Sequence, residues 1–314
     1  AVRRGPRLPI PILHFVYTER KLATGSTYMR CVQMRDALEQ AFPDKIDARL
    51  LAMPERRDGF AAQERWALSQ PGGGVYFFSK TSVRALTSFA ARLLKLRARS
   101  ILFDHVDEPA DRLRLLLADR HICCSHAQFL SFRAMAPDIA SRARLVLHAT
   151  DLRLEQTAPA QQSRFAPVYL GDPENTAIPD ALRSEVGVLS ARDRDEFAVQ
   201  IPRLPEFNLH FAARAFRAGQ GGAAKPFLKG FTAARLGANI LLPRDVEDAA
   251  HYLGPDYPYF YDEDEGPVSA FRRARADFGG PIWNRARDRM LSMSEVARPG
   301  VVAKQLLDVV NELG

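Results

Sequence analysis

Two lysines stand four residues apart where a helix is expected to begin. Lys225 and Lys229 follow a glycine-rich stretch at 219–224 and precede an alanine-rich segment. On a helix this spacing places both ammonium groups on one side, close to the backbone N–H groups of the first turn. Such an arrangement attracts a diphosphate or a similar anion. The alternative interpretation is a pair of solvated lysines on a helix face.

A second pattern that could bind an anion lies near the N-terminus. Gly25 and Ser26 follow an apolar strand expected over 10–17 and precede a helix expected over 27–42. A glycine there lets the backbone approach a ligand, and the Ser26 hydroxyl can cap the helix whose first N–H groups attract anions. The segment lacks the three ordered glycines of a dinucleotide-binding loop. An ordinary capped turn is the alternative interpretation.

The elements that must position these residues alternate between strand and helix. Apolar segments such as 10–17 and 75–79 are typical of strands buried on both faces, and helical patterns separate them. Repeated units of this size predict parallel sheets covered by helices. We therefore expect an α/β protein with two Rossmann-like parallel-sheet domains that face each other across a cleft, where a ligand binds.

A polar, aromatic-free stretch divides the chain and has the composition of a linker. From it we assign four parts: an N-terminal domain at 1–154, the linker at 155–164, a C-terminal domain at 165–299 and a final helix at 300–314. The first domain should contain one long helix over 83–99.

The composition is that of a globular protein, with 46% hydrophobic and 26% charged residues. No run approaches the roughly 18 apolar residues that a membrane-spanning helix needs, and the basic start does not resemble a signal peptide. The three cysteines, Cys31, Cys123 and Cys124, match neither a disulfide framework nor a zinc site. We expect a cytoplasmic protein.

Positive charge is concentrated in the first half of the chain. Residues 1–150 carry a net charge of +10, whereas the remainder carries −3. The excess suggests an anionic partner, or else a solvated arginine-rich surface. On the expected 83–99 helix, Arg92, Lys95 and Arg99 line one face, which could dock on an anionic membrane. Nucleic acid is a weaker expectation, because the basic half lacks interleaved aromatic residues and a recognition motif.

Four segments together resemble bacterial glycosyltransferases of the GT-B fold. The segment 225–241 is similar to their donor-binding loop and helix, and 169–175 to the first strand and turn of their C-terminal domain. The segments 207–214 and 147–153 resemble the parts that precede the donor loop and close the N-terminal domain. The order of these segments covers most of the chain.

The resemblance implies a nucleotide-sugar donor and a glycan or lipid-linked acceptor, with the N-terminal domain handling the acceptor. The donor site it implies consists of Gly25, Ser26, Gly171, Asn175, Arg214, Lys225, Lys229 and Thr232. Lys225, Lys229 and Thr232 would bind the diphosphate. A peripheral contact with the inner face of a membrane would suit a lipid-linked acceptor.

The chain departs from the family at the donor loop. Retaining members commonly carry two glutamates separated by seven residues there, whereas this loop begins with Lys225 and has no second glutamate. The metal-binding Asp-x-Asp motif of the other large glycosyltransferase fold is also missing. We therefore expect an inverting reaction without a metal or another cofactor, and a general base drawn from His105, His148 or Asp151. The alternatives are an inactive scaffold in glycan assembly and a sugar-nucleotide epimerase or hydrolase.

Overall fold

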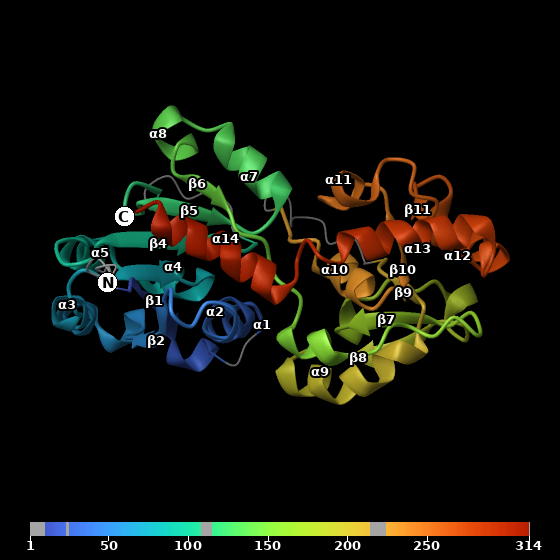
Figure 1. The fold of residues 1–314 in the computed structure, drawn as a ribbon, viewed down its shortest axis with the longest axis horizontal. Coiled ribbons are helices and arrows are strands. Elements are labelled where there is room, and N and C mark those ends of the chain that lie inside the picture. The colour runs from blue at the N-terminus through green and yellow to red at the C-terminus, as the bar shows by residue number, and fades with distance from the viewer. Residues whose placement is uncertain (1–9, 23–24, 108–114, 214–223, 314) are drawn as a thin grey trace, which may run out of the picture.

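The chain forms two lobes, each built on a parallel β-sheet (Figure 1). The computed structural model describes residues 10–22, 25–107, 115–213 and 224–313. The predicted class, two Rossmann-like parallel-sheet α/β units, is confirmed. None of the helices in these four stretches combines the length and the apolar character needed to span a membrane.

The N-terminal lobe contains a six-stranded sheet in the order β2-β1-β3-β4-β5-β6. Its strands are β1 (Ile12–Thr18), β2 (Asp47–Met53), β3 (Val75–Phe78), β4 (Ser100–Asp104), β5 (Arg120–Cys123) and β6 (Ala143–Leu145). Every pairing is parallel, and Phe15 on β1 lies between Leu50 on β2 and Phe77 on β3. All loops that follow these strands therefore emerge at one edge.

Alternate side chains of this sheet enter two separate cores. Leu13, Phe15 and Phe77 pack in the first, together with residues of α2 (Met34–Ala41) and α14 (Pro299–Asn311). Val16 and Phe78 pack in the second, together with residues of α3 (Phe60–Ser69), α4 (Lys80–Ala85) and α5 (Ser88–Lys95). Burial on both faces explains why these strands read as continuous apolar segments. Beyond β5 lie α7 (His126–Arg133) and α8 (Pro137–Ala140).

The C-terminal lobe contains a five-stranded parallel sheet in the order β11-β10-β9-β7-β8. Its strands are β7 (Pro167–Gly171), β8 (Gly187–Ser190), β9 (Leu209–Phe211), β10 (Asn239–Pro243) and β11 (Phe260–Tyr261). Its helices are α9 (Arg194–Gln200), α10 (Leu228–Arg235), α11 (Ala249–Leu253), α12 (Gly266–Asp277) and α13 (Pro281–Met293). Short 3-10 turns are η1 (Glu19–Lys21), η3 (Arg56–Asp58), η4 (Leu152–Gln156), η5 (Pro173–Asn175), η6 (Asp180–Leu182) and η7 (Ile201–Glu206).

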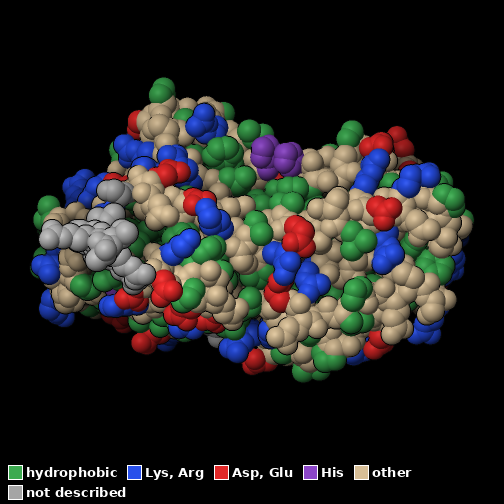
Figure 2. Space-filling model, in the orientation of Figure 1, with side chains coloured by type: hydrophobic (Ala, Val, Ile, Leu, Met, Phe, Trp, Pro, Cys, Tyr) green, Lys and Arg blue, Asp and Glu red, His purple; other side chains and the backbone are tan. Residues whose placement is uncertain are grey.

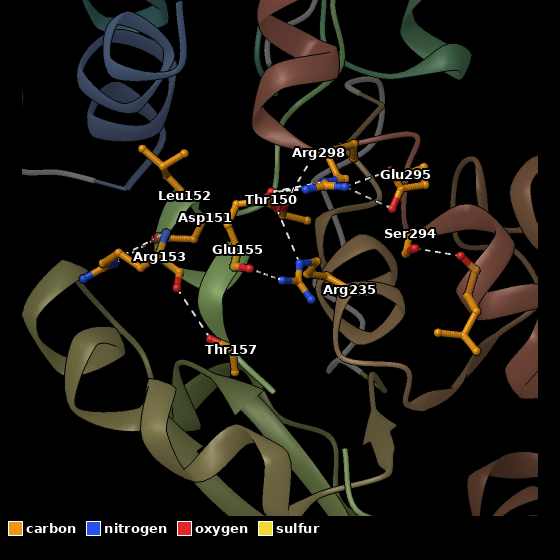
Figure 3. Close-up of polar contacts among 12 residues, drawn as sticks. Thr150, Asp151, Leu152, Arg153, Glu155, Thr157, Arg235, Ser294, Glu295 and Arg298 are labelled. Atoms are coloured by element: carbon orange, nitrogen blue, oxygen red, sulfur yellow. Dashed lines mark hydrogen bonds and ion pairs between the residues drawn. The ribbon is translucent and has the colours of Figure 1, made fainter. Parts of the chain in front are cut away.

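Two segments connect the lobes and meet at Glu155 (Figure 3). The Glu155 carboxylate lies 2.7 Å from the Nη2 of Arg298 and 3.4 Å from the Nε of Arg235. The Thr150 N–H donates to the Ala297 carbonyl at 2.9 Å. After this crossing, α14 returns to the N-terminal lobe, where Figure 1 shows it lying across the first sheet. The last element of the chain is therefore part of the first core.

The helix expected over 27–42 contains an irregular first half. It consists of α1 (Gly25–Thr27), a π-helical segment η2 (Tyr28–Gln33) and α2. Arg30 lies in the π-helical turn with 1% of its surface exposed. Its guanidinium group donates to both carboxylate oxygens of Asp104, at 3.0 and 2.8 Å, and to the Leu147 carbonyl at 2.6 Å.

The helix expected over 83–99 is two helices. The backbone leaves helical geometry at Leu86, and Thr87 caps α5 by accepting a hydrogen bond from the Ala90 N–H. The break changes which side of α5 is buried: Ala90, Ala91 and Leu94 are inside, whereas Phe89 and Leu96 are 54% and 82% exposed. Two large apolar side chains of this region are therefore exposed to solvent.

Candidate functional site

A cavity lies between the lobes, at the edge where the strands of both sheets end. It contains about 1020 Å³ of space, part of it open to solvent. The N-terminal lobe contributes the start of the helix that follows β1, and the connecting segment contributes two charged residues. The C-terminal lobe contributes the ends of β7 and β9, the turn after β8 and the start of α10. The lining residues are Gly25, Tyr28, Met29, Asp151, Arg153, Leu170, Gly171, Ala191, Arg192, Asp193, Arg194, Phe197, His210, Phe211, Ala212, Leu228, Lys229 and Thr232.

Lys229 lies at the first turn of α10, beside the end of β7. Its Nζ is 3.9 Å from the centre of the Tyr169 ring, which holds the cation by a cation–π contact. Gly171 closes this side of the cavity with φ at +144°, a conformation that favours glycine. A Cβ at Gly171 would come within 3.4 Å of both the Lys229 Nζ and the Tyr169 hydroxyl. A side chain there would therefore crowd the ammonium group.

His210 belongs to the middle strand of the second sheet and also lines the cavity. Burial, together with the positive charge of Lys229, lowers the pKa of His210 to about 3. Its Nε2 is buried and has no hydrogen-bond partner within the described part of the chain. A neutral imidazole thus lies beside an ammonium group at the cavity wall.

The other charged groups of the cavity are arranged around the crossing segment. Arg153 donates to both carboxylate oxygens of Asp151, at 2.9 and 2.7 Å. Burial alone would raise the pKa of Asp151, but these hydrogen bonds hold it below its usual value. The Arg153 guanidinium also donates to the Arg194 carbonyl at 3.3 Å, and the Arg194 guanidinium lies 4.5 Å from the centre of the Tyr28 ring. Through these contacts the two lobes meet at the cavity.

The structure brings five residues of the predicted site together at this cavity: Gly25, Asp151, Gly171, Lys229 and Thr232. Five described residues of the prediction do not line it: Ser26, Asn175, His105, His148 and Lys225. Asn175 donates to the carboxylate of Asp172 at 2.7 Å. Lys225 precedes α10, which begins only at Leu228. Arg214 lies outside the described residues.

The two predicted histidine bases are buried in the N-terminal lobe. The His105 Nε2 lies 3.1 Å from the Nδ1 of His121, and both rings pack against Phe132. Burial, together with His121, lowers the pKa of His105 to about 3. For His148, burial and the nearby charge of Arg30 lower the pKa to about 4. Both imidazoles are neutral at physiological pH and lie away from the cavity lining.

Sequence reasoning missed the turn that carries Arg192, Asp193 and Arg194, together with the helix α9 that follows. A signal for it existed: Asp193 is followed three residues later by Glu196, a pattern typical of a capped helix start. In the structure the Asp193 carboxylate accepts from the N–H of Glu196 at 2.9 Å. No spacing marks Tyr28 or His210, which lie in stretches that read as packing.

Comparisons with known proteins show the fold. No protein-family model matches the sequence, and a comparison with curated proteins finds no match. Among solved structures, a glycosyltransferase from Rickettsia africae aligns over 98% of this chain and 99% of its own, with a TM-score of 0.64 and 6% identity. Anabaena HepE in complex with UDP aligns over 96% and 100%, with a TM-score of 0.61 and 12% identity.

A third solved structure is a trehalose-6-phosphate synthase studied for glycosyl transfer with retention. It aligns over 96% of this chain and 99% of its own, with a TM-score of 0.59 and 9% identity. At these identities the likeness is one of fold, and the predicted GT-B arrangement of two parallel-sheet lobes is confirmed.

Four buried histidines make the stability of the fold sensitive to acid. The pKa is lowered to about 3 for His105 and His210 and to about 4 for His121 and His148. An unfolded histidine takes up a proton near pH 6.5, so below that pH the unfolded chain binds more protons than the folded one. Stability is therefore complete above pH 6.5 and decreases as the pH falls. We expect each histidine to cost about 1 kcal/mol of unfolding free energy between pH 6.5 and 5.5.

Urea unfolding at the two pH values measures this loss. In a His105→Gln variant that still folds, the loss of unfolding free energy between pH 6.5 and 5.5 should be smaller by about 1 kcal/mol, the contribution of one histidine. An unfolding free energy that does not change between pH 6.5 and 5.5 would contradict the assignment of neutral histidines.

Proposed function

We propose that this protein transfers a sugar from a nucleoside-diphosphate sugar to a hydroxyl group of a glycan or lipid-linked acceptor. The observation that carries the proposal is the cavity itself, where Lys229 and the first turn of α10 face the space between two parallel-sheet lobes. The GT-B fold shared with glycosyltransferases supports it, as does the UDP bound to Anabaena HepE.

The diphosphate of the donor is assigned to the start of α10. Lys229 supplies a cation and Thr232 a hydroxyl, and the free N–H groups of the first helical turn add partial positive charge. A side chain at position 171 would crowd the Lys229 ammonium group, so the glycine there leaves room for the donor to approach this charge. Lys225 precedes the helix by three residues and is assigned a supporting role at the edge of the same site. Gly25 lines the cavity from the other lobe, at the start of α1, and Ser26 follows it in the chain.

The reaction that we propose is a direct displacement with inversion, without a metal. Cationic groups at α10 stabilise the leaving diphosphate, which is the task that a metal performs in other transferases. The chain has no glutamate pair at the donor loop. Of the three predicted bases, Asp151 is the one that lines the cavity, and its lowered pKa keeps it ionised at physiological pH. The hydrogen bonds from Arg153 orient the carboxylate.

We also propose a peripheral contact with an anionic membrane, through α3 and α5 of the N-terminal lobe. Phe60 on α3, Phe89 on α5 and Leu96 directly after α5 are exposed by 73%, 54% and 82%. In the sequence Arg92 lies between Phe89 and Leu96, and Figure 2 shows further Lys and Arg side chains along the outer edge of this lobe. Exposed apolar side chains among basic ones match the chemistry of an anionic lipid surface. A lipid-linked acceptor in the cytoplasm would be reached from such a surface.

The diphosphate assignment predicts a specific loss in Lys229→Met, which keeps the aliphatic packing and removes the charge. Binding of the preferred nucleoside diphosphate should weaken by about 10- to 100-fold, because a charged hydrogen-bond donor is lost. Thermal unfolding with UDP, GDP, ADP, CDP and dTDP measures it, since bound ligand stabilises the fold. Lys304→Met, on the exposed face of α14, is the matched control and should bind as the native protein does. Unchanged affinity in Lys229→Met would overturn the assignment.

The mechanism predicts inversion at the anomeric carbon. It also predicts that the rate of sugar transfer is unchanged when a chelator removes metal ions. Asp151→Asn should lower the rate constant by about 10²- to 10⁴-fold with donor affinity nearly unchanged. NMR of the product anomeric carbon decides the stereochemistry. A retained configuration would refute the displacement, and native protein that binds the nucleotide without turnover would indicate an inactive scaffold.

The membrane contact predicts binding to vesicles that contain phosphatidylglycerol, and none to vesicles of phosphatidylcholine. Added salt should weaken the binding, because surface charge is screened over about 8 Å at physiological ionic strength. The double variant Arg92→Glu/Leu96→Glu should abolish flotation with the vesicles. Val199→Glu, which changes an exposed apolar residue of the C-terminal lobe, is the control and should float normally. If the protein does not bind phosphatidylglycerol vesicles even at low salt, the proposed membrane contact is wrong and the surface of α3 and α5 is simply exposed to solvent.

A further inference from the structure

His210 is a polar side chain that the fold buries without satisfying. Four per cent of its surface is exposed, and its Nε2 has no hydrogen-bond partner among the described residues. A buried polar atom without a partner costs stability, and where such an atom lines a cavity a ligand can supply the missing hydrogen bond. The ring lines the cavity between the lobes, where a ligand could supply the missing partner.

The backbone holds this imidazole in a fixed place. His210 is the middle residue of β9, and it pairs with Val168 on β7 at one side and with Ile240 on β10 at the other. Pairing on both sides fixes the backbone of His210 and the face of the sheet from which its side chain projects. The imidazole therefore starts from a rigid backbone at the cavity wall.

The neighbouring charge decides what the ligand atom can be. Lys229 lies close enough to depress the pKa of His210, which burial already lowers, so the ring stays neutral at physiological pH. A neutral imidazole carries one N–H group, and it can donate to an anion without placing a second full charge beside the ammonium group. An anionic oxygen drawn to the positive charge of Lys229 could also accept the N–H of His210.

We infer that the Nε2–H of His210 donates a hydrogen bond to a non-bridging phosphate oxygen of the bound nucleotide, next to the oxygen held by Lys229. This inference rests on the proposed function and adds a binding residue to its donor site. It assigns the N–H tautomer to Nε2. It also gives β9 a role in the site, through a side chain that recognises the diphosphate and is indifferent to the nucleobase.

Two variants of one residue test the hydrogen bond. His210→Gln places an amide N–H near the position of Nε2, whereas His210→Leu fills the space without a donor. Diphosphate binding to His210→Leu should weaken by about tenfold or more, and His210→Gln should recover most of that loss. The probes are the five nucleoside diphosphates with inorganic pyrophosphate, followed by thermal unfolding. The unphosphorylated nucleoside of the best diphosphate should bind equally to all three proteins.

The outcomes separate the inference from the function on which it rests. If the native protein is stabilised by none of the diphosphates, the proposed function fails. If the native protein is stabilised and His210→Leu binds the diphosphate equally well, the inference alone fails. Equal losses in His210→Gln and His210→Leu would also contradict it, because a donated hydrogen bond would then not be the cause.

A measurement on the native protein covers the case in which His210→Leu does not fold. The chain has 7 histidines, so selective ¹⁵N-histidine labelling gives a spectrum that can be assigned. We expect the Nε2–H signal of His210 to move and become protected from exchange when the diphosphate binds. Saturation with the diphosphate that leaves the His210 signals unchanged would overturn the inference.

Discussion

A buried ion pair between Arg30 and Asp104 constrains the geometry of the N-terminal lobe. Burial disfavours the charged guanidinium, but the Asp104 carboxylate compensates and raises the pKa of Arg30 above its usual value. Both partners are almost fully inaccessible, and the third donor of the fork is used by the Leu147 carbonyl. Loss of either partner would leave an uncompensated buried charge, which costs about 3–5 kcal/mol. Three segments, η2, the end of β4 and the chain after β6, must therefore keep one relative position.

That constraint extends to the cavity. Arg30 lies within the π-helical turn that also carries Tyr28 and Met29, so the ion pair determines where these two lining residues lie. The Leu147 carbonyl belongs to the segment that continues to Asp151 and then to the crossing at Glu155 (Figure 3). The cavity wall on the N-terminal side and the start of the connection between the lobes are thus positioned by one guanidinium group. A π-helical turn inside a helix is frequently found at a functional site, and this one contributes Tyr28 and Met29 to the cavity lining.

The alternation of strands and helices could be predicted because burial on both faces gives parallel strands a distinctive apolar run. The site was harder, because its residues depend on where each element starts. The four-residue spacing of Lys225 and Lys229 suggested one helix face, yet α10 begins at Leu228 and only Lys229 lies within it. His105 follows a strand end as predicted, but its partner His121 comes from the neighbouring strand and holds it in the core. Sequence spacing contains no information on such cross-strand partners, which only the pairing of β4 with β5 provides.

The distribution of charge shows a second limit of reading a site from composition. Residues 1–150 carry the positive excess, yet the residues that they contribute to the cavity are the uncharged Gly25, Tyr28 and Met29. The cations that line it, Arg153, Arg192, Arg194 and Lys229, all come from the half with a net charge of −3. Net charge acts over the whole surface, whereas an anion in a cavity responds to groups within a few ångströms, where the dielectric screening is weakest. The two basic features are therefore physically independent: the charge of the first half acts outward, at helices such as α5, and the cations of the second half act inward, on whatever the cavity binds.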